Sequence, residues 1–242
     1  MKNISYASFI AGSAQTLFGH PFDTLKTFKQ VNPNLSLNQV YKNHIKKNGG
    51  LKYLYRGSIS PFIGGCLQNC FIFSTEHITN KWIEKINGNQ NPILNSFYSG
   101  FLAGGFTSLI ISPTELIKCQ QQVNPLIKTK EIIKTTPIFR GFNLTFLRDS
   151  IGFGIYFSSY QYLQNENNNP LLNGGIAGVL SWSYSYPTDV IKTQYQINPK
   201  ITIKEILEKT TFNNYKAGLG IMLARAFVVN AAIFYTFELL KI

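Results

Sequence analysis

The chain has 242 residues, which is enough for one large domain or two small ones. Only 14% of its residues are charged, whereas a soluble globular domain carries roughly 25%, so a surface facing water on all sides is excluded. Lys and Arg outnumber Asp and Glu by 23 to 11. This excess indicates an anionic partner, which could be a nucleic acid, a membrane surface or a substrate.

The cysteines and histidines argue against two other classes of protein. Three cysteines are too few for a disulfide framework. Cys66 and Cys70 have no His or second Cys pair nearby, so we expect no metal site and no cofactor. The histidines fall in unrelated places and no Ser/His/acid set is evident, so we expect no enzyme. The first residues resemble neither a signal peptide nor a transit peptide, so any organelle address should be internal.

The same order of predicted elements occurs three times along the chain. Each time an apolar stretch with glycines runs through a proline, which makes it long enough to cross a bilayer. A short polar helix and a second apolar stretch follow. In chain order the elements are Ile4–Gly19, Leu37–Lys47, Ile59–Ile78, Ser96–Ser112, Lys128–Lys134, Phe142–Leu163, Leu171–Tyr186, Ile201–Lys209 and Leu219–Leu240. We therefore predict an all-α membrane protein of three tandem repeats, 1–93, 94–169 and 170–242, with six transmembrane helices, three short amphipathic helices and pseudo-threefold symmetry.

Charge and small residues support a membrane-embedded bundle. Lysines gather between the paired apolar stretches, whereas the opposite connections are short and largely uncharged, which is a membrane-type asymmetry. Small residues four apart, such as Gly100 and Gly104, would let neighbouring helix backbones approach closely in lipid.

One motif recurs at the end of each first apolar stretch: a proline, an acid two residues later and a lysine five residues later. A single copy would be an ordinary helix start. Three copies favour kinked, continuing helices whose acid and lysine share one face. Because ionisable groups in a span must be paired or face water, we expect a ring of charge pairs that gates one end of a cavity. The ring residues are Asp23, Lys26, Glu115, Lys118, Asp189 and Lys192.

These three segments resemble the Pro-x-[Asp/Glu]-x-x-[Lys/Arg] signature of the mitochondrial carrier family, and the resemblance covers essentially the whole chain. It implies a six-helix bundle in the mitochondrial inner membrane that works by alternating access, with the charged ring as its matrix gate. In the family a glutamine two residues after the lysine often braces this gate. Gln120 and Gln194 match, whereas Phe28 occupies the first-repeat position.

An aromatic-basic-glycine landmark precedes each second apolar stretch and resembles the family's cardiolipin sites. In such sites helix N-termini bind lipid phosphate. The residues implied are Arg56, Gly57, Arg140 and Gly141. The third landmark, Tyr215-Lys216-Ala217-Gly218, is interrupted by an alanine and could equally be a turn that needs glycine.

The family's outer gate uses an aromatic-acid-x-x-base motif near the ends of the even-numbered spans. Here the third repeat matches, with Glu238 and Lys241. Gln161 and Gln164 occupy these positions in the second repeat, and the first reads approximately Glu76–Asn80. Because neutral side chains replace charge pairs, we predict a weak outer gate and a strong matrix gate.

Few charged residues lie within the spans outside the gates. Arg148-Asp149 and Arg225 occur at the level where the family contacts its substrates, and this pattern resembles the ornithine, basic amino acid and carnitine branch. In this interpretation Asp149 meets a substrate ammonium while the two arginines meet its carboxylate. The structural alternative is an internal Arg225–Asp149 pair. The opposite wall would be formed by Gly64, Gln68 and Asn69.

Other functions stay open at this point. A nucleotide or deoxynucleotide carrier would suit the net charge of +12, although most of that charge lies between the paired spans. A soluble helical-repeat protein should carry more charge and fewer helix-interior glycines. A nucleic-acid binder is suggested by charge alone, without an aromatic platform. We therefore expect a monomeric carrier of a small solute with cardiolipin as lipid partner, in the inner membrane of mitochondria (a host's, if the source is a parasite or virus).

Overall fold

The computed structural model describes residues 2–32, 34–46, 50–55, 58–87, 91–124, 126–166, 169–210 and 218–239. The regular secondary structure of these residues is helical, as predicted. The long helices are α1 (Lys2–Val31), α4 (Ile59–Asn87), α5 (Pro92–Val123), α7 (Phe142–Glu166), α8 (Pro170–Ile197) and α11 (Leu219–Leu239). The short helices are α2 (Leu37–Val40), the π-helical turn η1 (Tyr41–Ile45), α3 (Leu51–Leu54), α6 (Thr129–Thr135) and α9 (Ile203–Lys209).

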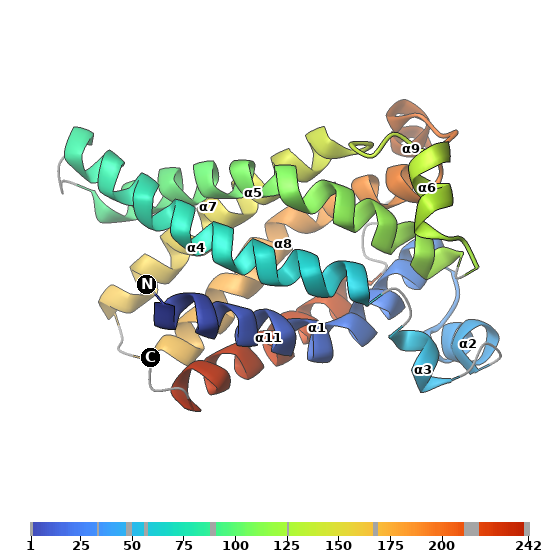
Figure 1. Cartoon of the computed structure of the whole chain (residues 1–242), viewed down its shortest axis with the longest axis horizontal. Helices are drawn as coiled ribbons and strands as arrows, with labels where there is room; N and C mark the ends of the chain where they lie inside the picture. The colour runs from blue at the N-terminus through green and yellow to red at the C-terminus, as the bar shows by residue number, and fades with distance from the viewer. Residues whose placement is uncertain are drawn as a thin grey trace.

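The long helices form a closed ring. Neighbours around the ring pack against each other in the order α1, α4, α5, α7, α8 and α11, and α11 returns to α1. Figure 1 shows them running along the long axis of the molecule, with both chain termini at one end and the short helices α2, α3, α6 and α9 at the other. This arrangement places equivalent parts of the repeats at the same level of the bundle.

The first helix of each repeat continues through its proline: Pro21 lies inside α1, Pro113 inside α5 and Pro187 inside α8. Proline lacks an N–H and leaves the carbonyl four residues earlier without its helical partner. In α1 this carbonyl belongs to Leu17, and the hydroxyl of Tyr55 donates a hydrogen bond to it at 3.1 Å. The charged motif after each proline therefore stays helical and faces the inside of the bundle.

Two glycines of α5 allow it to approach α7 closely. A Cβ on Gly104 would lie 2.3 Å from the carbonyl oxygen of Asp149, and one on Gly100 would lie 2.5 Å from that of Phe153. Real Cβ atoms do not come this close to a carbonyl oxygen. The expectation that these two small residues bring helix backbones together is confirmed.

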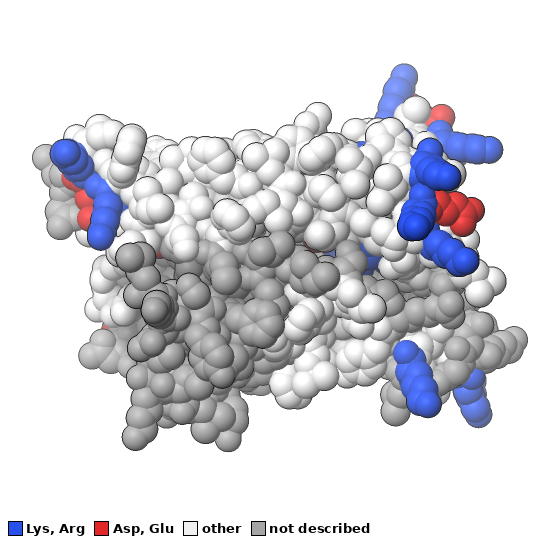
Figure 2. All heavy atoms as spheres, in the orientation of Figure 1, with Lys and Arg blue, Asp and Glu red and all other residues white. Residues whose placement is uncertain are grey.

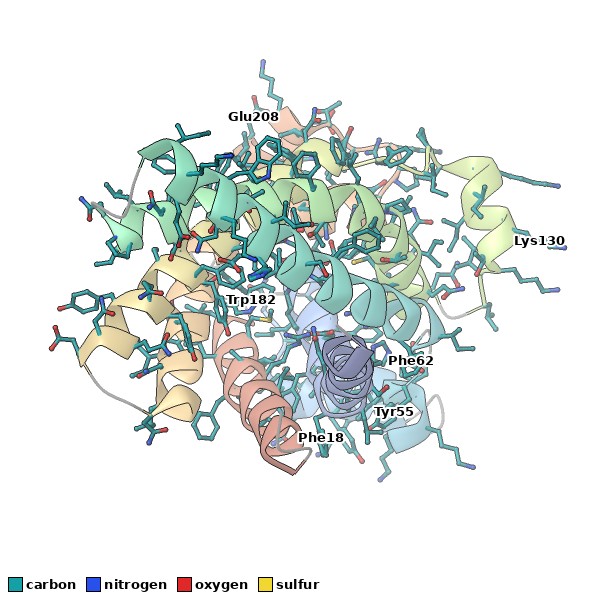
Figure 3. The ribbon with its side chains drawn as sticks, turned by 60° about the vertical axis from the view of Figure 1, so that its left-hand side comes forward. Phe18, Tyr55, Phe62, Lys130, Trp182 and Glu208 are labelled. Atoms are coloured by element: carbon teal, nitrogen blue, oxygen red, sulfur yellow. The ribbon has the colours of Figure 1, made fainter. Side chains whose placement is uncertain are left out.

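The three short amphipathic helices expected from the sequence are present, although the first divides into α2 and η1. Each buries one face, with Val40, Ile132 and Ile206 fully buried, and α2 and α9 each begin with a capping box. Their lysines lie on the outside. Figure 2 shows most of the visible Lys and Arg at this end of the described surface, a smaller group of basic and acidic residues at the opposite end, and an uncharged band between them. Figure 3 shows Lys130 projecting from α6.

The composition of the described helices gives one candidate membrane span. Helix α5 is long and apolar enough to cross a bilayer by these criteria, and Leu219–Val229 is a shorter apolar run. The expected count of six spans is therefore not confirmed. The physical reason lies in the polar interior, because α7 buries Arg148 and Asp149 while α8 buries Asp189 and Lys192, which lowers the mean hydropathy of these helices.

Candidate functional site

The six charged residues of the proline motif form one continuous ring of ion pairs. Lys26 pairs with Asp189, Lys118 with Asp23, and Lys192 with Glu115. Every pair joins two different repeats, so no lysine pairs with the acid of its own motif. The expected ring is present in the geometry, and each ion pair joins the first long helix of one repeat to the first long helix of another.

An arginine of α7 also belongs to the ring. Arg148 approaches three carboxylates: Asp149 at 2.8 Å, and Glu115 and Asp189 at 3.0 Å each. Its side chain is only 5% exposed. The sequence placed Arg148 midway through the span as a substrate contact, but the structure places its guanidinium between the ring acids of two repeats.

The other arginine, Arg225 on α11, pairs with Asp23 at 2.5 Å. Its guanidinium also lies over the ring of Trp182, at 5.9 Å from the centroid. The internal Arg225–Asp149 pair considered from the sequence is wrong in this structure, because each of the two residues has another partner. All three ring acids therefore contact an arginine in addition to a lysine.

The two predicted brace glutamines, Gln120 and Gln194, lie beyond the ring, toward the short helices, and differ in their surroundings. Gln120 donates to the carbonyl of Gln196 at 3.0 Å and lies 3.3 Å from the Thr136 hydroxyl. Gln194 is half-buried. Phe28 is buried against Tyr53, with ring centroids 6.1 Å apart, so the first repeat has apolar packing within itself at this position.

A second set of glutamines was missed by the sequence analysis. They stand nine residues after each proline and are almost fully buried: Gln30, Gln122 and Gln196, exposed by 1%, 2% and 0%. Each one reaches the preceding repeat in cyclic order. Gln30 lies 3.4 Å from Asp189, Gln122 bonds both Thr24 and Thr27, and Gln196 donates to the carbonyl of Arg140 at 3.3 Å. The constant spacing from proline was a signal that could have identified them.

A cavity of about 500 Å³, counting its open mouth, lies directly on the ring. Gln15, Thr16 and His20 line it from the part of α1 that precedes the ring, so the cavity extends from the ring toward the end of the molecule that holds the chain termini. The remaining lining residues are Asp23, Gln68, Ile111, Thr114, Glu115, Lys118 and Arg225.

The predicted substrate residues divide between the cavity and the ring. Arg225 and Gln68 line the cavity, whereas Arg148 and Asp149 are not among its described lining residues. Gly64 and Asn69 belong to α4, but their side-chain surroundings lie outside what the structure describes. A solute in the cavity would therefore meet the arginine of α11 before that of α7.

Arg140 contacts protein rather than open surface. Its guanidinium donates to the carbonyls of Tyr195 at 2.9 Å, Asn198 at 3.0 Å and Ile201 at 2.8 Å, and it stacks 3.7 Å from the centroid of the Tyr195 ring. It thereby caps the C-terminal end of α8. Lipid binding by the Arg140 side chain would have to compete with these bonds.

For the other residues of the predicted lipid and outer-gate sites, the structure describes few contacts that bear on their predicted roles. Gly141 has φ +84° and packs on Gln196, while Arg56 and Gly57 lie outside the described residues. Gln161 donates to Asn165 on its own helix at 3.3 Å, and Gln164 is exposed. Lys241 and the side chain of Glu238 are outside the described part of the chain, so both sites stay predictions.

Comparison with known proteins identifies the family. The family described as mitochondrial carrier protein matches the chain three times, over residues 3–87, 89–169 and 165–242. Similar proteins include mitochondrial ornithine transporter 1 of Saccharomyces cerevisiae, 29% identical over 96% of this chain and 92% of that protein. The mitochondrial basic amino acids transporter of Bos taurus is 30% identical over 95% and 88%. The human mitochondrial carnitine/acylcarnitine carrier protein is 27% identical over 98% and 92%.

The three matches confirm that the chain is built from carrier repeats and that it is a solute transporter and not an enzyme. They agree with the three charged motifs, which occupy the first helix of each repeat and meet in one ring. The chain belongs to the mitochondrial carrier family.

Proposed function

We propose that the chain exchanges an amino acid or a related zwitterion across the mitochondrial inner membrane by alternating access. One observation carries this proposal: the cavity ends on a closed charge ring and offers a solute both signs of charge at its floor. Arg225 and Lys118 are the cations there, and Asp23 and Glu115 are the carboxylates. A zwitterion can pair its carboxylate and its ammonium with such a floor at the same time.

The named relatives support the same substrate class. Similar proteins are named for ornithine, basic amino acids and carnitine, and each of these molecules carries a cation and a carboxylate. A nucleotide would instead place its phosphates next to two carboxylates of the cavity floor, which disfavours the nucleotide alternative.

Six membrane-spanning helices are part of this proposal. The long helices have 21 to 32 residues, which corresponds to lengths of roughly 30–48 Å, and a hydrocarbon core is about 30 Å thick. Exposed apolar side chains such as Phe106 and Leu180 cover their outer faces, while the polar side chains of α7 and α8 face the ring. Charged residues of this kind are tolerated in a span when they are paired inside a bundle.

The gates follow from the ring. In the described state the six motif residues close the end near the short helices, which we assign to the matrix, and the cavity faces the opposite side. Gln120 and Gln194 brace this gate, and the outer gate is weak because Gln161 and Gln164 replace charged residues. We place cardiolipin at the backbone amides that begin the second helix of each repeat, and we place the whole transport path within one monomer.

Exchange by purified protein in liposomes tests the proposal. Vesicles loaded with ornithine are offered labelled ornithine, arginine, carnitine, ADP or a deoxynucleotide. We expect saturable amino-acid uptake that Arg225→Ala abolishes and Arg225→Lys partly restores. Lys130→Ala, at an exposed position that points away from the bundle in Figure 3, is the matched control. Uptake of nucleotides without amino acids would overturn the substrate class and leave the carrier mechanism.

A further inference from the structure

The three ring acids are not equivalent, because the second repeat has a glutamate where the other two have aspartate. We propose that Glu115 selects among substrates by binding the cation on the substrate's side chain. The distal ammonium or guanidinium of a dibasic amino acid would bind an oxygen of Glu115 in place of the ring cations. This inference rests on the proposed transport of amino acids and names the residue that distinguishes dibasic substrates from others.

Access favours Glu115 over the other acids. Its side chain is 24% exposed, against 12% for Asp23 and 2% for Asp189. Among the described residues, the carboxylates that line the cavity are those of Asp23 and Glu115. Asp23 and Glu115 are each held by one lysine and one arginine, so the greater exposure of Glu115 is the difference between them. Glu115 is therefore the carboxylate that an incoming cation reaches most easily.

The present partners of Glu115 can release it without being left unpaired. Arg148 would keep its contacts with Asp149 at 2.8 Å and Asp189 at 3.0 Å. Asp149 and Glu115 share Arg148, and Lys192 pairs with Glu115, so Lys192 and Asp149 belong to the same cluster of ion pairs. Within the described contacts, Asp149 Oδ2 is buried without a hydrogen-bond partner, and we assign it as the acceptor for Lys192 once Glu115 is released. A buried charge that loses one partner and gains another avoids the large penalty of an unpaired ion.

The two ends of a substrate then have separate partners. Arg225 and Glu115 come from different helices, α11 and α5, and line the same cavity. The substrate's carboxylate would bind Arg225 in a charge-assisted hydrogen bond, and its side-chain cation would donate to Glu115. A quaternary ammonium has no N–H to donate, so carnitine would be attracted by charge alone. Asp149 acts in this scheme as the acceptor that receives Lys192, and it does not touch the substrate.

Two substitutions of Glu115 test the inference in a binding assay. The chain has two tryptophans, so Trp82→Phe leaves Trp182, whose ring lies 5.9 Å from Arg225, as the fluorescent reporter. The ligands are ornithine, lysine with one more methylene, and norvaline without a side-chain cation. With Glu115 intact, the Trp82→Phe protein should bind ornithine about tenfold or more tightly than norvaline, as expected for one charge-assisted bond.

Glu115→Gln should reduce this preference to roughly twofold or less, since only the charge of the side chain is lost. Glu115→Asp keeps the ring charge but withdraws the carboxylate by one methylene, so we expect the preference to move from ornithine toward lysine. Glu208→Gln on α9, which lies at an exposed position (Figure 3), is the matched control and should keep the original preference.

The outcomes separate this inference from the proposed function. Suppose that amino-acid exchange persists and that Glu115→Gln keeps the ornithine preference, or that Glu115→Asp keeps the chain-length preference. Either result would overturn the role of Glu115 and leave the proposed function standing. If the protein with Glu115 intact neither binds nor exchanges any amino acid, both the proposed function and the inference are wrong.

Discussion

Arg140 shows at the scale of one residue how a side chain predicted to bind lipid also holds the bundle together. Its guanidinium belongs to the second repeat, and the three carbonyls that it contacts belong to the third. Those carbonyls lie at and just beyond the end of α8, where helical partners are missing. The residue therefore satisfies acceptors that would otherwise need water and joins two repeats beneath the ring.

Replacing Arg140 tests this role. Because hydrogen bonds to charged groups contribute about 1.5–3 kcal/mol each when buried and less at a half-exposed site, we expect Arg140→Ala to lose roughly 2 kcal/mol in total. For a chain of this size that corresponds to a fall in Tm of about 4–8 °C in detergent. Arg140→Lys should recover only part, since lysine lacks the planar fork. An unchanged Tm in Arg140→Ala, judged against exposed Lys134→Ala, would contradict the clamp.

The partners of each ring residue determine how much transport activity returns when an acid and a lysine of the ring are swapped. Exchanging Asp23 and Lys118 as D23K with K118D keeps their mutual attraction but places a lysine against Arg225, which is 2.5 Å from Asp23 in the native pair. Like charges at close range cost several kcal/mol. We expect the double variant to stay more than about tenfold below wild type in liposome exchange. Recovery to the wild-type rate would show that Arg225 does not share Asp23 with the lysine.

At the scale of elements, the contact between α5 and α7 depends on glycine. The backbones approach so closely that a methyl group at Gly104 would overlap the carbonyl of Asp149. This contact fixes the height of Asp149 and its neighbour Arg148 relative to Glu115 on α5. Helix packing in the bundle thereby determines which carboxylates Arg148 can reach.

Alanine substitution of two helix glycines tests the contact between α5 and α7. Gly104→Ala should lower the free energy of unfolding by about 3 kcal/mol, because neither backbone can yield without moving a helix. Gly175→Ala on α8 is the control, since its Cβ would meet nothing within 4 Å, and it should be neutral or stabilising by up to about 1 kcal/mol. Equal Tm values for the two variants would mean that α5 and α7 are not packed this closely.

At the scale of the whole molecule, the ring divides the bundle into an accessible side and a closed side. The cavity reaches the ring from the end that holds the chain termini, whereas the short helices and their lysines lie beyond the ring (Figures 1 and 2). Alternating access requires that this division reverses during transport, so the described arrangement corresponds to one of two states.

Thiol labelling in vesicles tests which side is open. In a background in which Cys66, Cys70 and Cys119 are replaced by serine, Thr16→Cys in the cavity wall should react with a membrane-impermeant reagent from the side opposite to Lys130→Cys. A saturating substrate should slow labelling of Thr16→Cys about tenfold or more, as expected for an occupied site. Labelling of both positions from the same side would contradict the proposed topology.

The sequence by itself determined the repeats, the proline motif and the residues of the ring, because periodic spacing fixes which side chains share a helix face. It also determined the close approach at Gly100 and Gly104. The glutamines nine residues after each proline also recur at a constant spacing, so the sequence contained the signal for them as well.

Which charged side chains pair with one another was decided by the tertiary structure alone. Lys26 and Asp189 lie 163 positions apart in the sequence, and nothing local specifies that they meet. Arg148 joined the ring, Arg225 paired with Asp23, and Arg140 capped α8, because closing six helices into one ring sets the heights at which charges face each other. Local sequence fixes the face and the period of a helix, whereas contacts across the bundle depend on how all the helices pack together.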